Sequence, residues 1–170
     1  MGKKTIDYKE ASAAMIKGFE EGRTLLVTSN KEGKANVMAS GWGTIGTIWS
    51  RPILMVMVRP SRYSYALIEE VEEFTVNVMP PDLKEVVEYC GTVSGRDYDK
   101  IEEKKLTLIP SRKLKPPLIQ EGLLHFECRT VYKSDMVSSG LRQALAPKFY
   151  GTGNFHRLYF GEILACYLNE

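Results

Sequence analysis

One unbroken apolar run constrains this chain more than any other feature. Residues 53–58 read Ile-Leu-Met-Val-Met-Val, a stretch that is too short for a helix and rich in β-branched side chains. It predicts a strand that is buried on both faces. The run stops at Arg59-Pro60, and after four polar or aromatic residues a helical pattern begins at Tyr65.

The junction between this strand and this helix suits an anion. The amides in the first turn of a helix are unpaired, and the helix dipole favours negative charge there. Ser61 and Ser64 add hydroxyls, and Arg62 adds a forked cation beside Tyr63. The alternative is that a serine caps the helix while Arg62 is solvated.

Composition describes an ordinary globular chain. With 170 residues, 44% of them hydrophobic, we expect one domain, residues 1–170, with a substantial core. A net charge of +2 without a basic cluster argues against nucleic acid. No apolar run approaches the ~20 residues that span a bilayer, so we expect no membrane partner. The start of the sequence lacks a signal-peptide pattern, and the protein is expected to be cytoplasmic.

The cysteines and histidines give little support for a metal site. Three cysteines lie far apart, no Cys-x-x-Cys occurs, and there are only two histidines. We expect reduced thiols, with Cys128 and Cys166 as core residues.

The remaining pattern alternates short strands with isolated helices. Asp7 is expected to cap a first helix that ends at Gly22, and Gly33 to lie in a turn. The glycine-rich segment after residue 41 is expected to form a bulge or to approach a ligand closely. Strands are expected at residues 23–29, 35–41, 74–78, 106–109, 123–132 and 158–168. Without regular βαβ alternation, this pattern favours a barrel over a doubly wound sheet.

Five segments together resemble a known family. They are residues 34–44, 52–64, 73–78, 90–100 and 154–163. In this order and spacing they are similar to the flavin reductase-like family of FMN-binding split barrels, close to the flavoredoxin type. The resemblance covers roughly residues 20–166. It implies a mainly β fold with short helices, an antiparallel Greek-key split β-barrel, a bound FMN and a homodimer.

The resemblance also implies where the FMN phosphate would bind. Ser61, Arg62, Tyr63 and Ser64 meet it at the helix start. Residues 90–100 contribute Ser94, Gly95 and Lys100. Two cations suit a dianion. The alternative for Lys100 is a surface lysine that pairs with Glu102 or Glu103 on its own helix.

A strand edge is expected to run along the flavin ring and ribityl chain. Its members are Asn36, Ala39, Ser40, Gly41, Trp42, Gly43 and Thr44. Trp42 lies between two glycines, which leaves its indole open to a planar partner. The alternative for Asn36 is a turn residue that closes the hairpin at Gly33.

Three further residues are candidates for the cofactor site. Asn77 interrupts an apolar strand, so its amide needs either a backbone partner or a ligand. His156 and Tyr159 lie in the segment where the family places residues against the flavin from the partner subunit; a surface histidine is the competing interpretation for His156. Only one of Tyr159 and Phe160 can face the ligand, and the Tyr159 hydroxyl suits a polar ring edge. His125, by contrast, shares a strand face with Glu127 and Arg129 that we expect to be solvated.

No catalytic triad or carboxylate pair is visible, and none is needed if a flavin carries the chemistry. The leading hypothesis is an oxidoreductase that passes reducing equivalents from NAD(P)H through FMN to a flavin or another acceptor. A flavoredoxin-type electron carrier that serves a redox protein, or a non-enzymatic flavin-binding module, are the alternatives. Without a Gly-x-Gly-x-x-Gly after a strand, nicotinamide would have to bind without a Rossmann unit.

Overall fold

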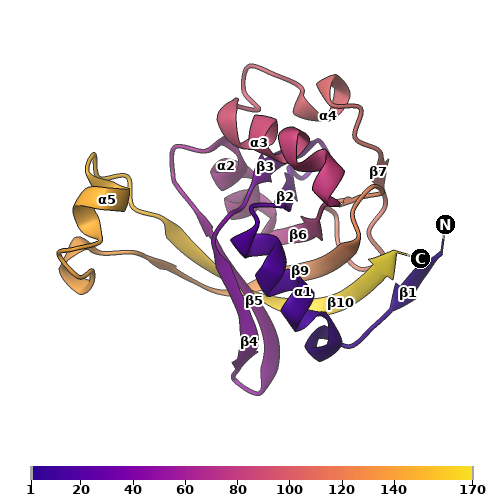
Figure 1. Ribbon diagram of the computed structural model, residues 1–170, viewed down its shortest axis with the longest axis horizontal. Helices are drawn as coiled ribbons and strands as arrows, with labels where there is room; N and C mark the ends of the chain where they lie inside the picture. Colours follow the sequence, from indigo (N-terminus) through magenta and orange to yellow (C-terminus); the bar gives the residue numbers. More distant parts are fainter. Residues whose placement is uncertain (1, 170) are drawn as a thin grey trace.

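The computed structural model describes residues 2–169, in which short helices surround one large antiparallel sheet (Figure 1). The strands are β1 (Lys3–Thr5), β2 (Thr24–Ser29), β3 (Ala35–Ala39), β4 (Gly43–Ile48), β5 (Arg51–Val58), β6 (Glu73–Val78), β7 (Leu108–Ile109), β8 (Leu118–Ile119), β9 (Leu124–Asp135) and β10 (Arg157–Asn169). β7 and β8 pair only with each other. The predicted mainly β, antiparallel architecture is confirmed.

The strand order forces the large sheet to roll up. Its path is β3-β2-β6-β9-β10-β5-β4, with β1 paired to β10, so β3 and β4 lie at opposite ends. In a flat sheet these two strands would be roughly 29 Å apart. Yet the four peptide steps from Ala39 to Gly43 reach about 14 Å at most. The sheet therefore curls into a barrel, and residues 40–42 cross its open seam, where no ladder joins the described parts of β3 and β4.

Irregular pairing between β9 and β10 accommodates this curvature. Their register shifts at Phe160/Gly161 and again at Ile163/Ala165, and such bulges bend and twist a strand. At Gly161 an added Cβ would lie 2.5 Å from Cζ of Phe74 and 2.8 Å from Cβ of Cys128. Only glycine fits between these side chains, so the strand can pass close to β6 and β9.

The helices pack on the barrel in two groups. They are α1 (Tyr8–Glu20), α2 (Tyr63–Val71), α3 (Lys84–Thr92), α4 (Lys100–Glu103) and α5 (Ala146–Tyr150), with single 3-10 turns at Pro81–Leu83 and Ser138–Gly140. As predicted, Asp7 caps α1, its carboxylate accepting from the Lys9 amide at 2.8 Å. Met15 and Phe19 of α1 join the larger hydrophobic cluster, whereas α3 covers a second cluster on the other face of β2.

One face that the sequence predicted to be solvated is buried. His125 and Glu127 of β9 are fully buried, and only Arg129 of that face reaches solvent. The loop before β8 covers this face, because the amides of Arg112 and Lys113 donate to the Glu127 carboxylate at 2.9 and 2.8 Å. Alternation along a strand cannot reveal a covering loop from elsewhere in the sequence.

The glycine-rich segment after residue 41 lacks the bulge that was one of its two predicted forms. Instead of a bulge, β4 pairs regularly with β5 over its whole length. The hairpin turns at Trp49 and Ser50, both in the left-handed region with φ of 53° and 56°. Two such residues match the twist of a tight hairpin, although glycine or asparagine is more usual there.

Residues 136–156, here called the arm, leave the barrel between β9 and β10 and carry α5 (Figure 1). At its base the Met136 amide donates to the His156 carbonyl at 3.0 Å. Arg59, at the end of β5, holds the arm by donating to the carbonyls of Phe149 and Asn154, each at 2.9 Å. The arm is therefore fixed beside the carboxyl end of β5.

Candidate functional site

Two adjoining cavities lie at the barrel seam. Cavity 1, of about 190 Å³, is lined by Met38, Ala39, Ser40, Gly41, Trp42, Met57, Arg59, Arg62 and His156. Cavity 2, of about 450 Å³, is lined by Asn36, Met38, Arg59, Ser61, Arg62, Tyr63, Ser64, Cys90, Thr92, Val93, Ser94, Gly95, Lys100 and Asn154. They share Met38, Arg59 and Arg62, so a ligand can extend from one into the other. Neither lining contains an aspartate or a glutamate.

Two helix ends meet at cavity 2. α2 begins here, with Arg62 as its N-cap residue and no side chain bonded to its first turn. Its first amides are therefore available to an anion, and its dipole favours one. The capping serine of the alternative interpretation is therefore wrong, whereas Arg62 is exposed, as that interpretation expected. Across the cavity α3 ends, and Arg62 donates to its Gly91 carbonyl at 3.1 Å.

Lys100 is buried in the same cavity and is only 3% exposed. Its ammonium donates to the carbonyls of Cys90 and Val93 at 3.0 and 3.3 Å, at the negative end of α3. An ammonium has three donors, so one remains for a ligand. Burial lowers the pKa of Lys100. Cys90 acts in the opposite direction and raises this pKa, whereas the charge of Arg62 lowers it further. The alternative of a surface lysine paired with Glu102 or Glu103 is wrong.

Two serine hydroxyls in cavity 2 are oriented by neighbouring amides. Asn36 of β3 donates to the Ser64 hydroxyl, and Asn154 of the arm donates to the Ser61 hydroxyl, each at 2.8 Å. Each serine oxygen thus accepts one bond and keeps its own proton to donate. Asn36 belongs to a strand and is buried, so its alternative role as a turn residue is wrong.

Gly95 allows Asn36 its position. A Cβ at Gly95 would lie 2.0 Å from Oδ1 of Asn36 and 2.9 Å from Cδ1 of Tyr63. Any side chain there would displace the amide that orients Ser64. The glycine is therefore required by close approach rather than by its φ angle.

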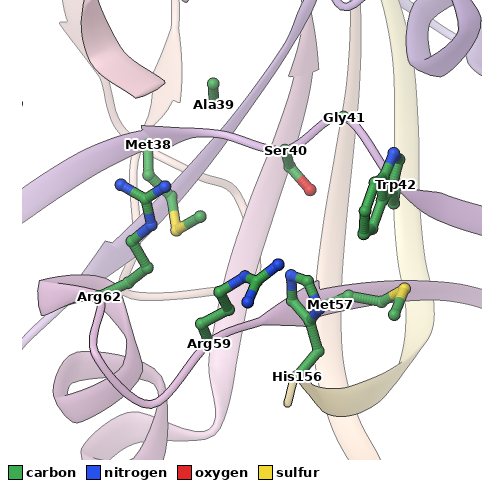
Figure 2. A pocket seen from close by; sticks show the side chains of 9 residues that line it. All are labelled: Met38, Ala39, Ser40, Gly41, Trp42, Met57, Arg59, Arg62 and His156. Atoms are coloured by element: carbon green, nitrogen blue, oxygen red, sulfur yellow. The ribbon is translucent and has the colours of Figure 1, made fainter. Parts of the chain in front are cut away.

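Cavity 1 combines apolar walls with unsatisfied polar groups (Figure 2). Figure 2 shows the Ser40 hydroxyl pointing into the space between Arg59 and Trp42. Ser40 is 3% exposed, and its hydroxyl has no hydrogen-bond partner among the described residues. Gly41 and Trp42 lie between two ladders, so strand pairing does not use their amides. Buried polar groups normally have partners, and a ligand can supply these.

His156 lines cavity 1 as a neutral ring. Burial, together with the charges of Arg59 and Arg62, lowers its pKa from 6.5 to about 4. Its Nδ1 lies 2.7 Å from the Tyr150 hydroxyl, which is also 3.2 Å from the Met136 sulfur. An imidazole nitrogen is a much better acceptor than a thioether, so we assign the tyrosine proton to Nδ1. The ring then carries its own proton on Nε2, as a donor.

All but four of the residues predicted for the site line these cavities. Gly43 and Thr44 belong to β4, where a Cβ on Gly43 would lie 2.6 Å from the Met55 carbonyl. Asn77 is fully buried elsewhere, and its Oδ1 accepts from the Ile119 amide at 3.1 Å and contacts the His125 ring at 2.8 Å. Tyr159 is a core residue whose hydroxyl donates to Glu69 at 2.7 Å. None of the four lines either cavity.

Several lining residues were not anticipated. Arg59 looked only like the end of a strand, and Met38 and Met57 like ordinary apolar strand residues. Asn154 and Thr92 lie inside two of the segments that resemble the family, but no role was predicted for either residue. The signal that could have found Arg59 is its place directly after a buried strand, where side chains reach the end of the sheet.

Other chemistry has little support in the described chain. Residues 2–169 contain no cluster of three or more potential metal ligands. No helix among them is long and apolar enough to cross a membrane. The three cysteines are free and buried, and burial raises the pKa of Cys90 beside Lys100.

Both histidine rings are expected to stay neutral well below their ordinary pKa. Burial and the charge of Lys3 lower the pKa of His125 to about 3, and that of His156 is about 4. The unfolded chain, with a histidine pKa near 6.5, binds more protons as the pH falls below about 6.5. The contribution of the two histidines to the free energy of unfolding therefore decreases on acidification from there and levels off below their folded pKa values.

NMR titration of the ring resonances checks this. Neither ring should shift between about pH 8 and pH 5.5, and a His156→Gln variant assigns the signals. A midpoint near 6.5 for either ring in the folded protein would contradict the burial argument.

Comparisons with known proteins agree with this geometry. The family model of the flavin reductase like domain matches residues 19–170. An uncharacterized protein of Archaeoglobus fulgidus is 37% identical over 142 residues, 84% of this chain and 70% of its own. Flavoredoxin from Methanosarcina acetivorans superposes with a TM-score of 0.69 at 32% identity, over 86% of this chain and 68% of that one.

A more distant structure shares the fold alone. An FMN-binding protein from Thermus thermophilus, solved with bound 1-cyclohex-2-enone, gives a TM-score of 0.66 at 19% identity, over 84% of this chain and 67% of that one. With the matched family model and a barrel that is open at one seam, the chain belongs to the flavin reductase-like domain family and has its split-barrel fold.

Proposed function

We propose that this chain, as one domain over residues 1–170, binds FMN and passes reducing equivalents from NAD(P)H through it to a flavin or another acceptor. The observation that carries the proposal is cavity 2. There the start of α2, Arg62, Lys100 and two oriented serine hydroxyls face one space with no lining carboxylate. This donor set fits a terminal phosphate dianion.

Cavity 1 fits the remaining parts of FMN. Its orphaned Ser40 hydroxyl and the seam amides match a ring edge rich in carbonyls and nitrogens. Met38, Met57 and the 43% exposed Trp42 offer apolar surface to a flat ring. The M. acetivorans relative is a flavoredoxin and the T. thermophilus one binds FMN, which supports the same assignment.

The side chains would bind and orient, and none need act as acid or base. FMN, when bound, would supply the redox chemistry by accepting two electrons from a nicotinamide and passing them on. Arg62, Lys100 and the two serines would hold the phosphate end. Trp42 would keep water from the ring and position the incoming reductant. Neutral His156 would present a hydrogen-bond donor without changing its protonation.

An electron-transfer role without NAD(P)H turnover is the second candidate. It is favoured by the flavoredoxin match at 32% identity and by Trp42, whose exposed indole would leave the ring close to an arriving redox protein. The same site would serve both functions, and only the source of electrons would differ.

The phosphate assignment predicts the effect of two substitutions. Arg62→Ala and Lys100→Met should each weaken FMN binding by about 1.5–3 kcal/mol, roughly one to two decades in Kd. Methionine fills the space of the buried lysine, so the fold should persist. Fluorescence titration of FMN measures the affinity, and Lys9→Met on the exposed face of α1 is the control. Unchanged affinity in both variants would remove the basis for the phosphate site.

The choice between the two functions rests on reduction by nicotinamide. Anaerobic stopped-flow mixing of FMN-loaded protein with NADH and then NADPH should bleach the flavin absorbance. Trp42→Ala should slow bleaching more than it weakens FMN binding, because the phosphate anchor lies in cavity 2. Ile16→Ala, at a 47% exposed position on α1, is the control. If neither nicotinamide reduces the wild type, the electron-transfer function takes precedence.

We also propose that the protein is a homodimer. Besides the family resemblance, the support is an aromatic patch formed by Trp49, Tyr132 and Phe160, with ring centroids 5.5–6.3 Å apart. Trp49 is 56% and Tyr132 49% exposed, and Val131 and Ile48 are exposed close by in sequence. An exposed apolar patch of this kind is typical of an interaction surface.

Sedimentation equilibrium tests the dimer. FMN-loaded wild type should sediment as a dimer at micromolar concentration, and the double variant Trp49→Ser, Tyr132→Ser should dissociate more readily. Tyr98→Ser, at an equally exposed position away from the patch, is the control. A wild type that is entirely monomeric with FMN bound would refute the proposal.

A further inference from the structure

The polar lining of cavity 1 consists of hydrogen-bond donors and cations. Arg59 and Arg62 are charged, His156 presents an N–H, and Ser40 has a free hydroxyl. The amides of residues 41–42 lie outside the ladders, and no lining residue is acidic. Such a wall interacts more strongly with an electron-rich ligand than with a neutral one.

Arg59 has no carboxylate partner among the described residues, although several other arginines do. Arg23, Arg51, Arg129 and Arg157 each form an ion pair with an aspartate or glutamate. The guanidinium of Arg59 bonds only to carbonyls within residues 2–169, those of Phe149 and Asn154. Its positive charge is therefore left for whatever occupies the cavities.

The arm fixes the orientation of this charge. Two carbonyls of the arm hold the two terminal nitrogens of Arg59 at 2.9 Å, and the guanidinium carbon lies 5.0 Å from the centre of the Tyr150 ring. Arg59 lines both cavities, at the boundary between them. A charge that is held in place before the ligand binds needs little reorganisation to act on it.

Resting on the proposed function, we propose that Arg59 makes the protein bind reduced FMN more tightly than oxidised FMN and so raises the midpoint potential of the bound flavin. Two-electron reduction adds electron density to the isoalloxazine, and a nearby fixed cation stabilises that state preferentially. By linkage, the ratio of the two affinities sets the shift in potential. Arg62 and Lys100 would instead hold the phosphate, whose charge does not change on reduction.

Three variants separate the charge of Arg59 from its role in holding the arm. Arg59→Gln keeps a donor for the arm carbonyls but removes the charge. Arg59→Lys keeps the charge but loses the forked geometry. Arg51→Gln, at the other end of β5 where the arginine pairs with Glu162 at 2.7 Å, is the matched control. Each is loaded with FMN, and its midpoint potential is measured by equilibrium reduction against a reference dye, together with the Kd of oxidised FMN.

We expect the preference of Arg59→Gln for reduced over oxidised FMN to be about tenfold smaller than that of the wild type. For a two-electron couple this lowers the midpoint potential by about 30 mV. Arg59→Lys and Arg51→Gln should stay close to the wild-type potential. Equal midpoint potentials in wild type and Arg59→Gln would overturn the inference. An equal fall of the midpoint potential in Arg59→Lys and Arg59→Gln would also overturn it, because that result assigns the effect to the geometry of the arm rather than to the charge.

Loss of oxidised-FMN binding in Arg59→Gln would also overturn it, since the oxidised affinity should change less than the reduced one. If the wild type itself binds no FMN, the proposed function fails together with this inference. If FMN binds and only the potentials disagree, the inference alone fails.

Discussion

Residues 40–42 join β3 to β4 across the barrel seam, and the rest of the site is arranged around this short connection. Because it must cross from one end of the rolled sheet to the other, the amides of Gly41 and Trp42 take part in no ladder. It also leaves the buried Ser40 hydroxyl without a partner and Trp42 exposed. An unsatisfied buried polar group costs about 1–3 kcal/mol. The seam is thus a place where the fold gains from binding a ligand.

Two opposed helix ends supply the donors and charges of the proposed anion site. α2 directs its positive end into cavity 2, while the carbonyl end of α3 holds Arg62 and Lys100 beside it. Burying an ammonium is unfavourable unless it is hydrogen-bonded, and the α3 carbonyls meet that requirement. The same contacts that make Lys100 tolerable in the interior keep its charge next to the space that a phosphate would fill.

Local signals in the sequence predicted the strand and the helix start correctly, because each is encoded within a few residues. Anion binding at the junction between them stays a prediction. The resemblance added Lys100, whose burial no local pattern reveals. Asn77 and His125 were misassigned because a segment that strand alternation does not reveal covers their strand face. The Ile119 amide donates to Asn77, and the amides of Arg112 and Lys113 donate to Glu127 on the same face as His125. Tyr159 was misassigned because its polar hydroxyl suggested that the side chain faces the ligand. In the structure this hydroxyl donates to Glu69 of α2 within the core. Arg59 was missed because its role depends on carbonyls of the arm, some ninety residues further along the chain.

The central claim is that the phosphate group anchors the ligand in cavity 2, and a comparison of FMN with riboflavin tests it most directly. The two differ only in the phosphate, so every ring contact is shared. Calorimetric titration of the same flavin-free preparation should give a Kd for FMN at least about a hundredfold lower, as expected for two or more charge-assisted contacts. Equal affinities for the two flavins would contradict the account and assign binding to the ring alone.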